Sequence, residues 1–245
     1  MRDLIRGVCL GALPLLLASA PAGAQAAASG ARPAAAPATA KAAPVPPLDS
    51  VVTRAARSRM LGKQEAPLLI YVFSDFQCPF CREFETGTFP AIDSAYVRTG
   101  KARVVFLNFP LNIHPHSWVG AEAAMCAGAQ GKFWPMHDTL FAEQKQWVDA
   151  AEPETVFERY AANLGLNLQE FRTCTRDDQP ATLLIRDLTA GASGGVQGTP
   201  TIVVLREPKK GEEPKDVQRI FTGAVSFSQF REAADELLKG AAGKP

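Results

Sequence analysis

The first strong pattern in the chain is a continuous apolar run over residues 68–73, Leu-Leu-Ile-Tyr-Val-Phe. A run rich in branched and aromatic side chains, without polar alternation, is typical of a strand buried on both faces of a sheet. A helical pattern follows from Arg82 towards Tyr96, and residues 102–109 form a second strand candidate that Pro110 ends. The pattern therefore predicts a β-α-β unit.

The middle of the chain has helical periodicity only. Between His116 and about Gly194 no segment has a convincing strand pattern. Successive helices are predicted over residues 120–131, 133–147, 154–164, 168–175 and 179–192. We therefore expect a helical insertion, residues 113–196, between the two parts of one domain, residues 48–112 and 197–241.

After the insertion the pattern returns to strands. Pro200 stands at the first position of a strand predicted to run to Leu205, a place where proline removes no ladder hydrogen bond. A charged hairpin over residues 207–216 leads into a strand over 218–222, and an amphipathic helix is predicted over 227–239. The predicted order is β-α-β, helices, β-β-α.

The N-terminus has the pattern of an export signal. Two arginines precede an apolar stretch over residues 7–20, and small residues spaced for cleavage end at Ala24 or Ala26. We therefore predict a signal peptide over residues 1–26 and a mature protein in the periplasm. An uncleaved membrane anchor is the alternative, but this stretch is shorter than the roughly 20 residues that a spanning helix needs. Cys9 lies at the start of the stretch, so we expect its removal rather than its lipidation.

Composition adds a linker and excludes some partners. Residues 27–47 are almost all Ala, Pro, Gly, Ser and Thr, which offer no amphipathic face to bury, so we expect a disordered linker. The 245 residues are otherwise ordinary for a globular protein, with 47% apolar and 21% charged side chains. The formal charge of +1 indicates neither nucleic acid nor a charged membrane surface as a partner.

Four cysteines remain after the predicted signal: Cys78, Cys81, Cys126 and Cys174. An even count in an exported protein suggests disulfides. The first two form a tight Cys-Pro-Phe-Cys motif, whose short loop adds little stability, whereas the other two lie 48 positions apart in different predicted helices. The contrast indicates one working pair and one structural bridge, with two buried free thiols at Cys126 and Cys174 as the alternative.

The motif lies where the first predicted strand turns into a helix. Unpaired backbone N–H groups at a helix N-terminus stabilise an anion and lower the pKa of a cysteine there. Cys78 is therefore the predicted nucleophile, and Pro79 suits the first turn because its missing N–H would have no partner. Cys81, one turn deeper, is placed to resolve a mixed disulfide by attacking Cys78.

A zinc or copper site is the competing chemistry, because His114 and His116 could supply two ligands beside the motif cysteines. Pro115 between them is typical of a loop, and we favour loop or helix-capping roles for both. The third histidine, His137, is interpreted as a partly buried packing residue or a surface residue. We expect no metal, and no cofactor other than the redox-active cysteine pair.

These residues resemble the DsbA-like branch of the thioredoxin superfamily. The shared features are the strand, Asp-Phe-Gln-Cys-Pro-Phe-Cys and helix of residues 68–85, the Lys-Phe-Trp and His-Asp stretches of the insertion, and Gly-Thr-Pro-Thr at 198–201. The match covers roughly residues 60–240. It implies an α/β thioredoxin fold, a central mixed β-sheet flanked by helices, with an inserted all-helical subdomain.

The resemblance also implies a site and partners. Pro200 would be cis and lie against the cysteine pair, and the backbone of Thr199 would pair with an extended substrate peptide. Pro79 and Phe80 belong to the same predicted active-site loop. Such proteins pass a disulfide to unfolded exported proteins, and a DsbB-type membrane partner reoxidises them. We therefore expect a monomeric thiol:disulfide oxidoreductase that introduces disulfide bonds; members with a second disulfide in the insertion agree with the second cysteine pair.

Two departures from the family pattern bear on the chemistry. Strong oxidants of the family carry Pro-His between the cysteines. The Phe80 side chain cannot supply a histidine's charge or hydrogen bond to the Cys78 thiolate, so a milder oxidant is expected. Val72 occupies a strand position where the family often has a buried acid, so a proton acceptor for Cys81 must come from elsewhere. Asp75 is near in sequence, but a turn or cap role is the better interpretation.

Three other functions would use a similar fold. A DsbC- or DsbG-like isomerase or reductase would carry an N-terminal dimerisation domain, for which residues 25–60 are too short and too rich in Ala and Pro. A metal- or peptide-binding protein of the same fold, without turnover, is the alternative from another class. A kappa-type glutathione transferase is disfavoured by the intact cysteine pair and the predicted signal.

Overall fold

The computed structural model describes residues 50–208 and 218–240, which all belong to one structural unit, residues 44–245. The predicted signal peptide, Cys9, the predicted linker and residues 209–216 of the predicted hairpin lie outside the described residues. None of the helices in those two ranges combines the length and the apolar character needed to span a bilayer.

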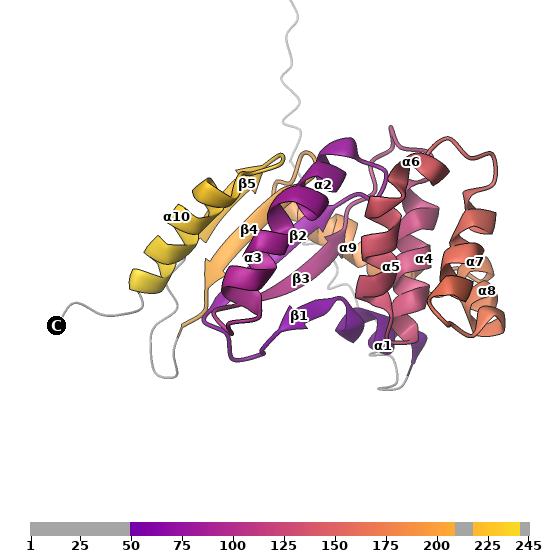
Figure 1. Cartoon of the computed structure of the whole chain (residues 1–245), viewed down its shortest axis with the longest axis horizontal. Helices are drawn as coiled ribbons and strands as arrows, with labels where there is room; N and C mark the ends of the chain where they lie inside the picture. Colours follow the sequence, from indigo (N-terminus) through magenta and orange to yellow (C-terminus); the bar gives the residue numbers. More distant parts are fainter. Residues whose placement is uncertain (1–49, 209–217, 241–245) are drawn as a thin grey trace, which may run out of the picture. The chain divides into compact units, whose positions relative to one another are not determined.

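A mixed β-sheet, the helices around it and a helical insertion make up this unit (Figure 1). In chain order the elements are α1 (Val51–Ser58), β1 (Met60–Gly62), β2 (Leu68–Ser74), α2 (Pro79–Glu83), η1 (Phe84–Thr88), α3 (Phe89–Ile92), η2 (Asp93–Val97), β3 (Ala102–Asn108), α4 (Ser117–Ala129), α5 (Phe133–Ala142), α6 (Gln144–Trp147), α7 (Pro153–Asn163), α8 (Leu168–Arg176), α9 (Ala181–Ser193), β4 (Thr201–Arg206), β5 (Gln218–Thr222) and α10 (Phe227–Lys239). The predicted fold class is confirmed.

Strand β2 lies at the centre of the sheet, whose order is β1-β3-β2-β4-β5. It pairs in parallel with β3 and antiparallel with β4, so that Ile70 lies opposite Val104 on one side and Val204 on the other. All of its residues except Tyr71 are buried, which explains the continuous apolar run: a central strand covered on both faces has no side to expose. Strands β1 and β5 form the antiparallel edges.

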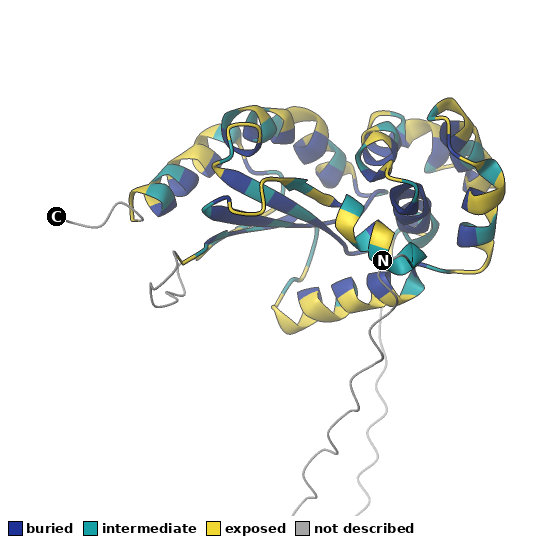
Figure 2. Cartoon of the chain, turned by 90° about the horizontal axis from the view of Figure 1, so that it is seen from below, coloured by how far each residue is buried: buried dark blue, intermediate teal, exposed yellow. Residues whose placement is uncertain are grey.

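Helices cover both faces of the sheet. Figure 1 shows α2, α3 and α10 in front of it and α9 behind it, and Figure 2 shows that the helices bury the sides that face the sheet. On one face, Phe84 and Phe230 pack against Ile70 and its neighbours. On the other, α9 approaches so closely that a Cβ at Gly191 would lie 2.5 Å from the ring of Phe109.

The insertion, α4 to α9, packs around α4. Eleven of the thirteen residues of α4 are buried, and most of them are small, which lets neighbouring helices approach on several sides. A disulfide joins Cys126 on α4 to Cys174 on α8, with the Cα atoms 5.7 Å apart. The same core cluster includes Cys78 and Cys81, so the insertion packs directly against the cysteine motif.

Several predicted boundaries needed correction. The elements α1 and β1 were not predicted, because both are short and only partly buried and depend on distant partners, such as the Arg54 Nε–Ala129 carbonyl bond of 2.8 Å. Pro200 precedes β4 instead of starting it. Proline has no N–H to donate, so the ladder of hydrogen bonds begins at the next residue, Thr201. The helix after the motif is divided by π-helical turns near Pro90, which lacks the N–H of a continuous α-helix.

Candidate active site

The cysteine motif occupies the turn from β2 into α2, where the sequence placed it. Cys78 is the N-cap of α2 in an extended conformation, and Pro79 takes the first helical position. The Cys78 N–H donates to the Asp75 carbonyl at 3.0 Å, and the Arg82 N–H donates to the Cys78 carbonyl at 3.1 Å. Cys78 therefore sits at the positive end of the helix, with its backbone held from both sides.

The Gly-Thr-Pro segment, about 120 residues away in sequence, comes against the motif. The Thr199–Pro200 peptide bond is cis, as the resemblance implied, and the Cys78 thiol donates to the Thr199 carbonyl at 3.5 Å. Cys78 and Cys81 are both free thiols, with 3% and 0% of their surface exposed. The Sγ atom of Cys81 lies 3.4 Å from the Asp75 N–H, deeper in the fold.

The two thiols differ in acidity. A hydrogen bond from the Cys81 thiol, the largest effect, outweighs burial and, with the backbone N–H groups of Cys81 and Phe80, lowers the pKa of Cys78 to about 6. Burial, followed by the bond to Cys78 and its charge, raises the pKa of Cys81 well above its usual value. Near neutral pH the site therefore holds a thiolate at Cys78 beside a protonated Cys81.

Asp75 ties this turn to the loop that precedes α4. Its buried carboxylate accepts bonds from the N–H groups of Gln77 (2.8 Å) and Leu111 (2.9 Å), the Ser117 hydroxyl (2.5 Å) and His114 Nδ1 (2.7 Å). Only its backbone N–H reaches the Cys81 sulfur. The carboxylate is thus engaged in holding the turn, in agreement with its interpretation as a turn residue.

The two neighbouring histidines belong to the same loop. The His114 side chain bonds to Asp75. His116 is the N-cap residue of α4, although its side chain makes no capping bond. The His116 N–H donates to Gln77 Oε1 at 2.7 Å. Within residues 50–208 and 218–240 no group of three or more His, Cys, Asp or Glu side chains is placed to hold a metal ion.

Gln144 is a site residue that sequence reasoning missed. Its buried side-chain amide, at the start of α6, donates to the carbonyls of Phe76 at 2.8 Å and Cys78 at 3.0 Å. No local pattern could reveal this, because a single glutamine lies 66 positions from the cysteine that it contacts.

His137 was also misjudged, because it is wholly buried. Its Nε2 lies 3.5 Å from Glu85 Oε2, on the segment that follows the motif, and its Nδ1 lies 2.9 Å from Asp138 Oδ1. Burial alone would lower the pKa of His137, but the negative charges of Glu85 and Asp138 outweigh it and raise the pKa to about 9. The result is a buried ion pair between His137 and Glu85, which lies on η1 directly after α2.

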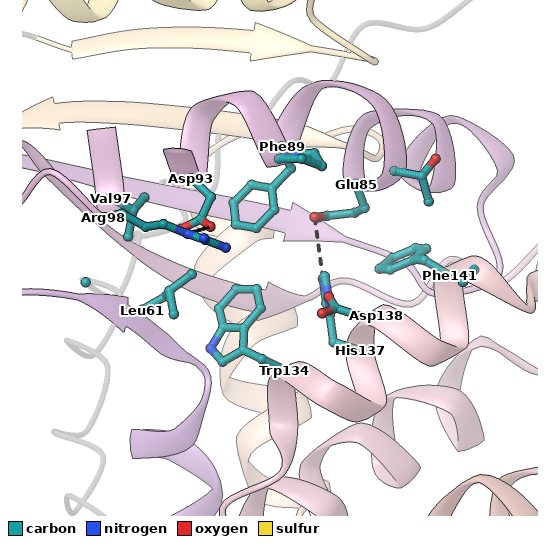
Figure 3. A pocket seen from close by; sticks show the side chains of 14 residues that line it. Leu61, Glu85, Phe89, Asp93, Val97, Arg98, Trp134, His137, Asp138 and Phe141 are labelled. Carbon is teal, nitrogen blue, oxygen red and sulfur yellow. Dashed lines mark hydrogen bonds and ion pairs between the residues drawn. The ribbon is translucent and has the colours of Figure 1, made fainter. Parts of the chain in front are cut away.

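Figure 3 shows this pair at the wall of a pocket of about 660 Å³, with aromatic side chains around it. Phe89 and Trp134 stack in parallel with ring centroids 5.7 Å apart, and Phe141 closes one side. The lining includes neither motif cysteine, so the pocket and the cysteine site are separate features.

The fold and the site together define a class of protein: a thioredoxin fold in which a Cys-x-x-Cys dithiol at a helix N-terminus lies against a cis-proline loop. The model of the Thioredoxin family matches residues 54–221. The chain therefore belongs to the thioredoxin family.

Individual proteins show the same relationship. The crystal structure of α-DsbA1 from Wolbachia pipientis superposes with a TM-score of 0.65 at 22% identity, covering 75% of this chain and 92% of that one. A probable disulfide bond formation protein D from Bacillus anthracis is 28% identical over 152 residues, 59% of this chain and 68% of the relative. The Na(+)/H(+) antiporter NhaA 3 from Salinispora tropica is 37% identical over 171 residues, 69% of this chain; the chain spans only 24% of that relative's length.

Proposed function

We propose that this protein is an exported oxidase of protein thiols, which donates the Cys78–Cys81 disulfide to unfolded exported proteins. The observation that carries the proposal is the unequal pair of sulfurs: an acidic Cys78 beside the Thr199 carbonyl and a deeper Cys81 that keeps its proton. A thiol that is stable as a thiolate is a good leaving group and stabilises the reduced enzyme, which makes the disulfide oxidising.

The reaction begins with the Cys78–Cys81 disulfide. A substrate thiolate attacks Cys78 Sγ, a substrate–Cys78 bond forms, and Cys81 leaves and takes up a proton. A second substrate thiolate then attacks the substrate sulfur of this mixed disulfide, and Cys78 leaves as a stabilised thiolate. Two electrons pass from the substrate dithiol to the enzyme, and a membrane partner of the DsbB type would remove them.

Substrate contacts are proposed around Cys78. The backbone of Thr199 would pair with an extended substrate segment. Phe80 and Ile113, which are 61% and 78% exposed, are apolar side chains that an unfolded chain can cover. Asp75 bonds Leu111 and His114 on either side of Ile113, so this loop is held beside the motif before substrate arrives.

The equilibrium between the protein and glutathione tests the proposal. We expect a reduction potential more positive than about −200 mV for the Cys78–Cys81 pair, measured by thiol trapping and mass spectrometry so that Cys126 and Cys174 are counted separately. A potential near −270 mV, about that of thioredoxin, would contradict an oxidase and favour a reductase or isomerase.

A trapping experiment tests the roles of the two sulfurs. With an unfolded exported protein whose single cysteine is held in a mixed disulfide with a small thiol, Cys81→Ser should release the small thiol and accumulate a covalent complex through Cys78. Cys78→Ser, the matched control, should accumulate none. Equal trapping by both variants would contradict the assignment of Cys78 as the attacking sulfur.

A further inference from the structure

Gln144 reaches the cysteine motif from a different part of the fold. It is the first residue of α6 in the helical insertion, and 5% of its surface is exposed, whereas its neighbours Lys145 and Gln146 face solvent. Its Nε2 group donates to the carbonyls of Phe76 and Cys78, which lie on either side of Gln77. A single amide group thus spans the turn that presents the nucleophile.

This arrangement requires two donors on one neutral nitrogen. A glutamine amide carries two N–H donors and no charge, so it can bond two carbonyls without adding a buried charge beside a thiolate. A glutamate would place acceptor oxygens against acceptor oxygens, and an apolar side chain would leave the Phe76 carbonyl without this bond. Either change costs free energy in a buried site.

A second bond holds the same corner of the insertion to the motif helix. Arg82, one residue after Cys81, donates from Nε to the Phe141 carbonyl near the end of α5, at 3.1 Å. The turn between α5 and α6 is therefore bonded to the motif on both sides of the cysteine pair. The orientation of Cys78 is coupled in this way to the packing of the insertion.

We infer that Gln144 is a positioning residue that holds the Cys78 turn so that the nucleophilic sulfur keeps its hydrogen bonds. The Cys78 backbone that Gln144 fixes carries the sulfur towards the Cys81 thiol and the N–H groups of Phe80 and Cys81. Releasing the turn weakens these bonds, and the thiolate and the reduced enzyme lose stability together. The inference rests on the proposed thiol–disulfide chemistry of Cys78.

The test compares Gln144→Met and Gln144→Glu with the unaltered protein. Methionine nearly fills the same space without a donor, and glutamate places charged acceptor oxygens against the two carbonyls. We expect Gln144→Met to lower the thiolate fraction of Cys78, read from absorbance at 240 nm near pH 6, by roughly three- to tenfold. The equilibrium constant with glutathione should shift towards the enzyme disulfide by a similar factor, and Gln144→Glu should show larger changes.

Gln146→Ala is the matched control, because it alters an exposed glutamine of the same short helix and should leave both readouts unchanged. If Gln144→Met does not fold, Gln144→Asn, which keeps the amide but shortens it, is measured in the same way and should give a smaller shift in the same direction. A lower melting temperature with unchanged titration and equilibrium constant would overturn the inference and leave Gln144 a purely structural residue.

The unaltered protein separates this inference from the proposed function. If its own potential is that of a reductase, the oxidase proposal fails, whereas the effect of Gln144 on the Cys78 titration is still decided. If the protein is oxidising and the Gln144 variants titrate and equilibrate as it does, only the positioning role is wrong.

Discussion

At the scale of single residues, the two motif sulfurs differ because hydrogen bonds converge on one of them. Cys78 accepts bonds from the Cys81 thiol and from backbone N–H groups, whereas the pKa of Cys81 is governed mainly by burial. An acidic nucleophile is thus obtained without a histidine at position 80. How oxidising the pair is, and whether it is milder than its Pro-His relatives, stays a prediction.

The buried His137–Glu85 pair predicts a pH dependence of stability. The folded pKa of His137 is about 9 and the unfolded value about 6.5, so its contribution is fully present below about pH 6.5 and is lost as the pH rises through about 9. We expect the free energy of unfolding to fall by up to about 3 kcal/mol over this window. Urea unfolding of the protein with Cys78 and Cys81 oxidised measures it without thiol titration.

Glu85→Gln is the matched variant for this prediction. Without the partner charge, burial keeps His137 neutral, so the decline in stability between about pH 7 and pH 9 should shrink strongly. Equal declines in both proteins would show that other groups cause the dependence.

At the scale of elements, α4 is the centre of the helical insertion. This almost wholly buried helix contacts α1, α5, α7 and α8, and its core cluster includes both motif cysteines. Its small side chains allow that close packing, but they leave few large apolar groups to anchor the outer helices. The Cys126–Cys174 disulfide supplies a covalent anchor between α4 and α8 at a sequence separation of 48.

Removing this disulfide should destabilise the protein without changing its chemistry. For a loop of this length, the chain-entropy model predicts a loss of about 4 kcal/mol in the free energy of unfolding for Cys126→Ala/Cys174→Ala. Urea unfolding measures the loss, and the glutathione equilibrium of Cys78 and Cys81 should stay unchanged at a temperature where the variant is folded. A shifted equilibrium would mean that the bridge also tunes the active site.

At the scale of the whole molecule, one buried ion pair joins three regions. Arg59, between α1 and β1, pairs with Asp187 on α9, and the same carboxylate accepts bonds from the N–H (2.9 Å) and side-chain amide (3.2 Å) of Asn108 at the end of β3. The pair therefore links the N-terminal helix and edge strand to the insertion helix that covers the sheet.

Asp187→Ala should unfold the molecule at clearly lower urea concentration. It leaves the Arg59 charge buried without a partner, which we expect to cost about 3–5 kcal/mol of unfolding free energy. Asp177→Asn, which removes an exposed pair with Arg176, is the control and should leave the urea midpoint unchanged. Equal effects of the two substitutions would contradict a specific role for the buried pair.

The sequence by itself determined the features that depend on neighbouring residues. Apolar runs and helical periodicity predicted β2, β5 and α10 within one residue of their ends, because burial pattern and local conformation are written in consecutive positions. The start of α2 at the Cys-Pro-Phe-Cys motif also followed, since Pro79 favours a first helical turn.

Only the tertiary structure decided which distant groups meet around the sulfurs. The Thr199 carbonyl at Cys78, the Gln144 amide on the turn, and Glu85 beside His137 join residues from separate elements. The short α1 and β1 likewise exist through their partners. Such contacts depend on how the insertion packs against the sheet, and no local propensity encodes that packing, because helix and strand preferences reflect neighbouring positions alone.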